Sequence, residues 1–213
     1  MLPSNEERIE NAAIELRRRW GIPEQKCPDI PTMIFKLKHE GLIKDYVRVP
    51  DVEMPDDEAE YNPHTGIMKI RESVFQAAND VYGRRAKNRA RFTIAHEIAH
   101  VVLGHTGTRH RNVSDRKIER ILIQIRVDEI EANRFAAAFL MPMHLIDMSL
   151  NPTPTEISFQ FQVSEAAAST RLDQLKRLER RKSGTKRPLP DFVREYLSEA
   201  RSRGHKINSL DEE

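Results

Sequence analysis

The sequence has a single cysteine, Cys27, and no long run of apolar residues. One cysteine excludes an intramolecular disulfide and a thiolate-rich zinc cluster. No apolar stretch approaches the roughly 18 residues that a membrane-spanning helix needs, and the glutamate-rich N-terminal segment is unlike a signal peptide. These absences fit a reducing compartment, so we expect a cytoplasmic protein with no membrane partner.

The sequence also has little excess charge of one sign, with a formal net charge of +2 over 213 residues. A charge of this size does not by itself indicate nucleic-acid binding. Basic residues nevertheless gather near the C-terminus: Lys176, Arg177, Arg180, Arg181, Lys182, Lys186 and Arg187. Such a run is typical of a solvated helix end and could also meet phosphates. Contact with DNA is therefore an open but less favoured interpretation.

Apolar periodicity predicts an α+β fold, mainly helical with a small β-sheet. Ser4 and Glu7 have the spacing of a capping box at the start of a first helix, which Gly21 ends. Strands are predicted at 46–49, 59–61 and 67–70, with a hairpin turn at 62–66, and helices at 33–37, 88–103 and 115–141.

The proline-rich segment 151–155 predicts a boundary. We expect a main domain at 1–150, a small helix-turn-helix-like module at 151–182, and a basic, polar C-terminal tail at 183–213. Packing against the main domain, docking of a protein and contact with DNA are all open roles for the module.

The motif with the clearest chemistry is His96-Glu97-Ile98-Ala99-His100, inside a predicted helix. Residues four apart lie one turn apart on the same helix face, so His96 and His100 can bind one metal ion. Glu97 lies beside them and can act as a general base. An HExxH motif in an apolar helix is typical of zinc peptidases.

A catalytic zinc site needs a third protein ligand. His105 is nearby, but its spacing differs from that of the extended HExxHxxGxxH motif. On the next predicted helix, Asp128, Glu131 and Phe135 share one face. Glu131 is the favoured ligand, and Asp128 and His105 are alternatives.

Two blocks of sequence resemble the signature of ImmA/IrrE-type metallopeptidases. The first runs from Arg91 to His100 and the second, EANRFAAAFLMP, from Glu131 to Pro142. The resemblance implies a zincin-like domain in which His96, His100 and Glu131 hold Zn²⁺ and Glu97 is catalytic. Such sites also accept other divalent ions, so Mn²⁺ is expected to substitute in vitro.

The resemblance also implies a substrate. Members of this family typically cleave a helix-turn-helix transcriptional repressor at one or a few sites. This cleavage derepresses mobile-element or stress-response genes. The alternative is a transcription regulator or toxin–antitoxin partner that binds a repressor or DNA without efficient catalysis.

Supporting groups around the metal are less defined in the sequence. Phe135 stands where the wider thermolysin pattern has an acidic residue, so we expect Asp128 or Glu129 to orient the first histidine. Candidates for stabilising the oxyanion are Tyr61, His64 and His144.

Overall fold

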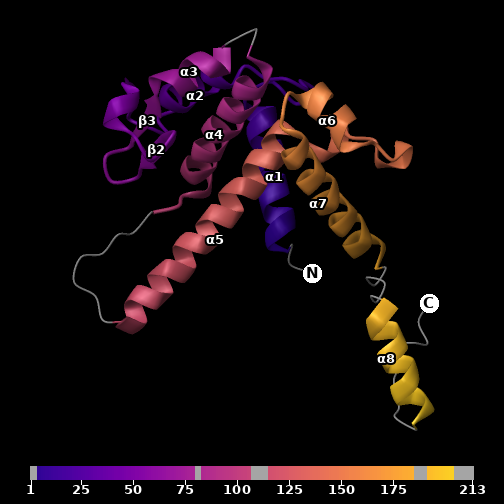
Figure 1. Ribbon diagram of the computed structural model, residues 1–213. Helices are drawn as coiled ribbons and strands as arrows, with labels where there is room; N and C mark the ends of the chain where they lie inside the picture. The colour runs from indigo at the N-terminus through magenta and orange to yellow at the C-terminus, as the bar shows by residue number, and fades with distance from the viewer. Residues whose placement is uncertain (1–3, 80–82, 107–114, 185–190, 204–213) are drawn as a thin grey trace. The chain divides into compact units, whose positions relative to one another are not determined.

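The computed structural model describes residues 4–79, 83–106, 115–184 and 191–203 (Figure 1). Its helices are α1 (Asn5–Arg19), α2 (Ile30–His39), α3 (Glu72–Asn79), α4 (Arg84–Leu103), α5 (Asp115–Leu140), α6 (Pro154–Phe161), α7 (Glu165–Ser183) and α8 (Asp191–Ser202). Its strands are β1 (Asp45–Val49), β2 (Ala59–Asn62) and β3 (Ile67–Arg71). Helices predominate over one small sheet, which confirms the predicted α+β class.

The sheet has the order β1-β3-β2, with β1 parallel and β2 antiparallel to β3. The predicted turn joins β2 to β3, and Gly66 adopts φ +68 there, a conformation that glycine adopts without strain. Met68 and Ile70 of the central strand are fully buried. Strand β2 forms an edge of the sheet and contacts α4, so this edge lies beside the HExxH helix.

Helix α1 begins at the predicted capping box, in which Ser4 and Glu7 bond reciprocally. Its apolar face buries Ile9, Ala13 and Leu16 and packs against α5. This packing places the polar start of α1 beside the middle of α5.

Helices α4 and α5 form the centre of the fold. Helix α4 ends as predicted at Gly104, which adopts φ +70 in a left-handed cap. Small or apolar side chains on both helices are fully buried: Ile94, Ala95, Ile98, Ala99, Ala132, Phe135, Ala136, Ala138 and Phe139. Small residues let two helix backbones approach closely, which lets polar side chains of α4 and α5 meet.

Residues 151–175 belong to the same compact unit as residues 1–150. Residues 1–175 form one compact unit and residues 176–213 form another. The domain boundaries at 150 and 182 stay predictions. Asn88 of α4 donates to the carbonyl of Val163, between α6 and α7, at 2.8 Å. Apolar side chains of this segment hold it against the rest of the unit, because Phe161 and Val163 are fully buried.

The predicted tail at 183–213 contains helix α8, and its remaining part lies largely outside the described residues. The exposed basic residues Lys176, Arg177 and Lys182 lie on the last turns of α7, whereas Lys186 and Arg187 are outside the description. Among the described residues, no helix combines the length and hydrophobicity that crossing a membrane requires.

A buried ion pair joins α1 to α7. The Arg171 guanidinium is 0% exposed and binds both carboxylate oxygens of Glu10, the Nη2 contact measuring 2.9 Å. Arg171 Nε also donates to the Met141 carbonyl at 2.9 Å. Because each charge is buried, each depends on the other for compensation.

We predict that Glu10→Ala lowers the free energy of unfolding by roughly 3–5 kcal/mol, because it leaves Arg171 buried without its counter-charge. Chemical denaturation of the metal-free protein measures this. The matched control is Glu15→Ala on the same helix, where the carboxylate is 73% exposed and the expected change is below about 1 kcal/mol. Equal effects of the two substitutions would contradict the prediction.

Candidate metal centre

Helix α4 presents His96 and His100 one turn apart, as the motif predicts. Their Nε2 atoms lie 3.0 Å from each other, and both rings are half-buried. Two nitrogens bound to one tetrahedral zinc ion, with bonds of about 2.0–2.1 Å, lie about 3.3 Å apart. The histidine pair therefore has the spacing of two ligands of one ion.

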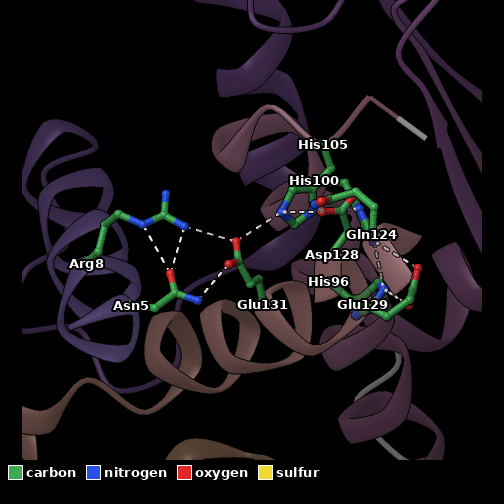
Figure 2. Close-up of polar contacts among 9 residues, drawn as sticks. All are labelled: Asn5, Arg8, His96, His100, His105, Gln124, Asp128, Glu129 and Glu131. Atoms are coloured by element: carbon green, nitrogen blue, oxygen red, sulfur yellow. Dashed lines mark hydrogen bonds and ion pairs between the residues drawn. The ribbon is translucent and has the colours of Figure 1, made fainter. Parts of the chain in front are cut away.

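The carboxylate that meets this pair belongs to Glu129 of α5 (Figure 2). Its Oε2 lies 3.2 Å from His96 Nε2, and its Oε1 lies 3.5 Å from His100 Nε2. The three side chains, here called the metal cluster, each offer a ligand atom, and these atoms all lie within 4.8 Å of one another. Two imidazoles and one carboxylate are a donor set that zinc accepts, so the residues present fit a metal ion.

Glu131, the ligand favoured from the sequence, is not brought to the histidine pair. Its carboxylate accepts hydrogen bonds from Asn5 Nδ2 at 2.7 Å and Arg8 Nη2 at 3.1 Å, both from α1. Residues two apart on a helix point about 200° apart, so Glu129 and Glu131 lie on opposite faces of α5. Burial alone would raise the pKa of Glu131, but hydrogen bonds from Asn5 and His105 and the charge of Arg8 lower it.

The Nδ1 atom of the first histidine, on the ring edge away from the metal cluster, has an amide as its partner. His96 Nδ1 lies 3.2 Å from Asn133 Oδ1, whereas we expected Asp128 or Glu129 in this role. Asp128 instead accepts from Gln124 Nε2 at 2.7 Å. With Nδ1–H of His96 donated to the amide oxygen, Nε2 is left unprotonated and free to bind a metal.

His105 lies beside the metal cluster without joining it. Its Nδ1 is 3.0 Å from Nδ1 of His100, on the ring edge opposite the cluster, and its Nε2 is 3.4 Å from Glu131 Oε2. The left-handed turn at Gly104 folds this residue back over the end of α4. Sequence spacing counted against His105 as a ligand, but it did not reveal this contact.

Burial, together with the neighbouring His96 and His105, lowers the pKa of His100 to about 3. His100 is therefore neutral at physiological pH in the metal-free protein. A neutral imidazole is the form that binds metal ions.

Glu97 points from α4 toward the sheet and is buried. Its Oε2 accepts a hydrogen bond of 2.7 Å from the backbone N–H of Tyr61 in β2. Burial, helped by the charges of Glu129, Glu60 and Asp57, raises the pKa of Glu97 to about 7, against the opposing effect of that hydrogen bond. A carboxylate poised near neutrality can both accept and return a proton.

The three candidates for stabilising an oxyanion lie in different parts of the fold. Tyr61 reaches the site through its backbone, and its N–H bonds to Glu97. His144 Nε2 instead lies 3.0 Å from the Pro23 carbonyl and 3.6 Å from Glu24. His64 is exposed in the hairpin turn, where its N–H donates to the Asn62 side chain. Their role in stabilising an oxyanion stays a prediction.

A helix-borne histidine pair, an adjoining buried glutamate and a carboxylate from a second helix define the class of the protein as metallopeptidase-like. Comparison with known families then gives the family. Residues 82–173 match the model of the IrrE N-terminal-like domain, Peptidase_M78. These residues therefore form an IrrE N-terminal-like domain, in agreement with the resemblance of the two sequence blocks to ImmA/IrrE-type metallopeptidases. The match extends through α6 into α7, in agreement with the compact unit that ends at residue 175. No curated protein matches the chain.

We predict that Glu97→Gln stabilises the metal-free protein at pH 8 but not at pH 5. The pKa of Glu97 is raised in the folded protein, so the protonated carboxyl stabilises the fold fully below its ordinary pKa of 4.5. This contribution is lost as the pH rises through about 7 and the buried carboxyl ionises. The glutamine amide cannot ionise, so at pH 8 the free energy of unfolding of Glu97→Gln should exceed that of the wild type by roughly 1–3 kcal/mol. Denaturation in the presence of a chelator at both pH values measures it.

The control is Glu15→Gln, an exposed position on α1. Its difference from the wild type is expected to be the same at pH 5 and pH 8. A Glu97→Gln difference that is equally independent of pH would contradict the prediction.

Proposed function

We propose that the chain is a zinc-dependent endopeptidase whose metal is held by His96, His100 and Glu129. The observation that carries the proposal is the convergence of these three side chains, with their ligand atoms within 4.8 Å of one another. The family match supports a peptidase. Glu129 takes the place of Glu131 in the ligand set that we expected from the sequence.

The bound ion would supply Lewis acidity, which polarises a scissile carbonyl and makes water a better nucleophile at neutral pH. Glu97 lies beside the histidine pair, where it accepts the proton of the attacking water and returns it to the leaving amine. The hydrogen bond from Tyr61 N–H occupies one carboxylate oxygen and leaves the other, Oε1, for this proton transfer. Burial also keeps bulk water from competing for the carboxylate.

An extended segment of substrate is proposed to run beside β2. This strand pairs with β3 on one side only, and the backbone N–H of Tyr61 on its other side points to Glu97. A peptide that added to this edge would carry its backbone past the general base.

The substrate that we propose is a helix-turn-helix transcriptional repressor, with cleavage leading to derepression of mobile-element or stress-response genes in the cytoplasm. Support comes from the similarity to ImmA/IrrE-type enzymes. The alternative is a regulator or toxin–antitoxin partner that binds a repressor or DNA without efficient cleavage. The exposed basic residues at the end of α7 favour that alternative.

We predict that the purified protein with Zn²⁺ or Mn²⁺ cuts the helix-turn-helix repressor encoded beside its gene at one or a few sites. Intact-mass measurement of the repressor over time follows the reaction. Glu97→Gln should reduce the rate by about 100-fold or more, because the general base is lost. It should still bind zinc, because Glu97 is not among the three ligands.

Chelator is the control for metal dependence and should stop cleavage by the wild type. An intact repressor that is bound equally tightly by the wild type and Glu97→Gln would contradict the peptidase proposal and favour the non-cleaving regulator.

We predict that Glu129→Gln weakens zinc binding by about 100-fold or more, because it removes an anionic ligand from the metal cluster. Competition with a chromophoric chelator measures the dissociation constant. Glu15→Gln is the control and should bind zinc as tightly as the wild type. A Glu129→Gln protein with wild-type affinity would show that another carboxylate supplies the third ligand.

A further inference from the structure

A chain of polar contacts runs from His100 to the start of α1 (Figure 2). It begins at His100 Nδ1, on the ring edge opposite the metal cluster, and passes to His105 Nδ1 at 3.0 Å. His105 Nε2 then lies 3.4 Å from Glu131 Oε2. Glu131 accepts in turn from Asn5 and Arg8, at 2.7 and 3.1 Å. The chain thus links α4, α5 and α1.

The contacts admit one consistent arrangement of protons when His100 binds a metal. A ligand histidine uses an unprotonated nitrogen, so with Nε2 on the ion, Nδ1 of His100 carries the proton. That proton is donated to an unprotonated Nδ1 of His105, whose own proton is then on Nε2. This N–H donates to the Glu131 carboxylate, which also accepts from the two α1 side chains. Every contact therefore has one donor and one acceptor.

We propose that His105 and Glu131 are a positioning pair that fixes the ring orientation and the tautomer of His100 for metal binding. This inference rests on the proposed metal centre. Groups that hold the outer nitrogen of a ligand histidine typically contribute 10–100-fold to metal affinity. Asn5 and Arg8 extend the pair by holding the Glu131 carboxylate in place.

The local structure holds His105 where this role requires it. Residue 105 is 8% exposed, so water competes little for its ring nitrogens. Its backbone N–H donates to the His100 carbonyl at 3.0 Å, directly after the left-handed turn at Gly104. Backbone and side chain of His105 both return to His100, and the two rings lie 4.9 Å apart in an edge-on arrangement.

The test compares zinc affinities of full-length His105→Phe and His105→Asn by chelator competition. Phenylalanine keeps a ring that fills the space but has no nitrogen. Asparagine loses the ring but places an oxygen acceptor on Cγ, where Nδ1 of histidine is attached. We expect His105→Phe to bind zinc 10–100-fold more weakly than the wild type, and His105→Asn to recover part of the loss. A role limited to packing predicts the opposite order, which would overturn the proposal.

Glu131→Gln tests the second member of the pair and does not depend on the folding of the His105 variants. Loss of the carboxylate charge should weaken zinc binding by roughly tenfold or more, with Glu15→Gln unchanged. Thermal unfolding of each metal-free variant identifies any that fails to fold, and Glu131→Gln then decides alone. Wild-type affinity in Glu131→Gln and in a folded His105→Phe would overturn the positioning pair.

The zinc-binding results distinguish a failure of the proposed metal centre from a failure of the positioning pair. A wild-type protein that binds no zinc would overturn both proposals. Tight zinc binding that Glu129→Gln weakens, with His105 and Glu131 variants at wild-type affinity, would leave the metal centre standing and overturn the positioning pair alone.

Discussion

The close packing of α4 against α5 is the constraint from which the rest of the site follows. Both helices bury alanines with no exposed surface, among them Ala95, Ala99, Ala132 and Ala136. Small side chains bring the backbones near enough for short polar side chains to meet across the contact. The histidines of α4 therefore reach a carboxylate of α5, and the two helices present their ligands as parts of a rigid core.

Local sequence signals predicted most of the framework. The capping box at Ser4, the turn at Gly66 and the left-handed end of α4 at Gly104 each depend on neighbouring residues only. The same holds for the histidine pair, because one helical turn fixes the spacing of His96 and His100. The α+β class followed from these signals, and the two sequence blocks predicted the similarity of residues 82–173 to the IrrE N-terminal-like domain.

Which face of α5 turns toward α4 is a tertiary property. The sequence favoured Glu131 as the third ligand, with Asp128 and His105 as alternatives, and offered Glu129 only as a partner of the first histidine. Glu131 shares a face with Phe135, which is fully buried, and this periodicity made it look like an inward ligand. Glu129 is half-exposed but shares its face with Asn133, four residues on, and that face meets His96. Two polar residues at this spacing were the available signal. The contacts of Glu131 with α1 bridge more than 120 residues, so no local pattern encodes them.

The hydrogen bond between Asn5 and Glu131 spans 126 positions, and this separation bears on when the site comes into being. During synthesis from the N-terminus, α4 is complete before Glu129 and Glu131 have been added. A contact between remote segments also forms slowly, because closing a long loop costs chain entropy before the contact compensates for it. The histidine pair can thus exist as a helical turn in a growing chain, while the centre around it matures only after α5 has docked between α1 and α4.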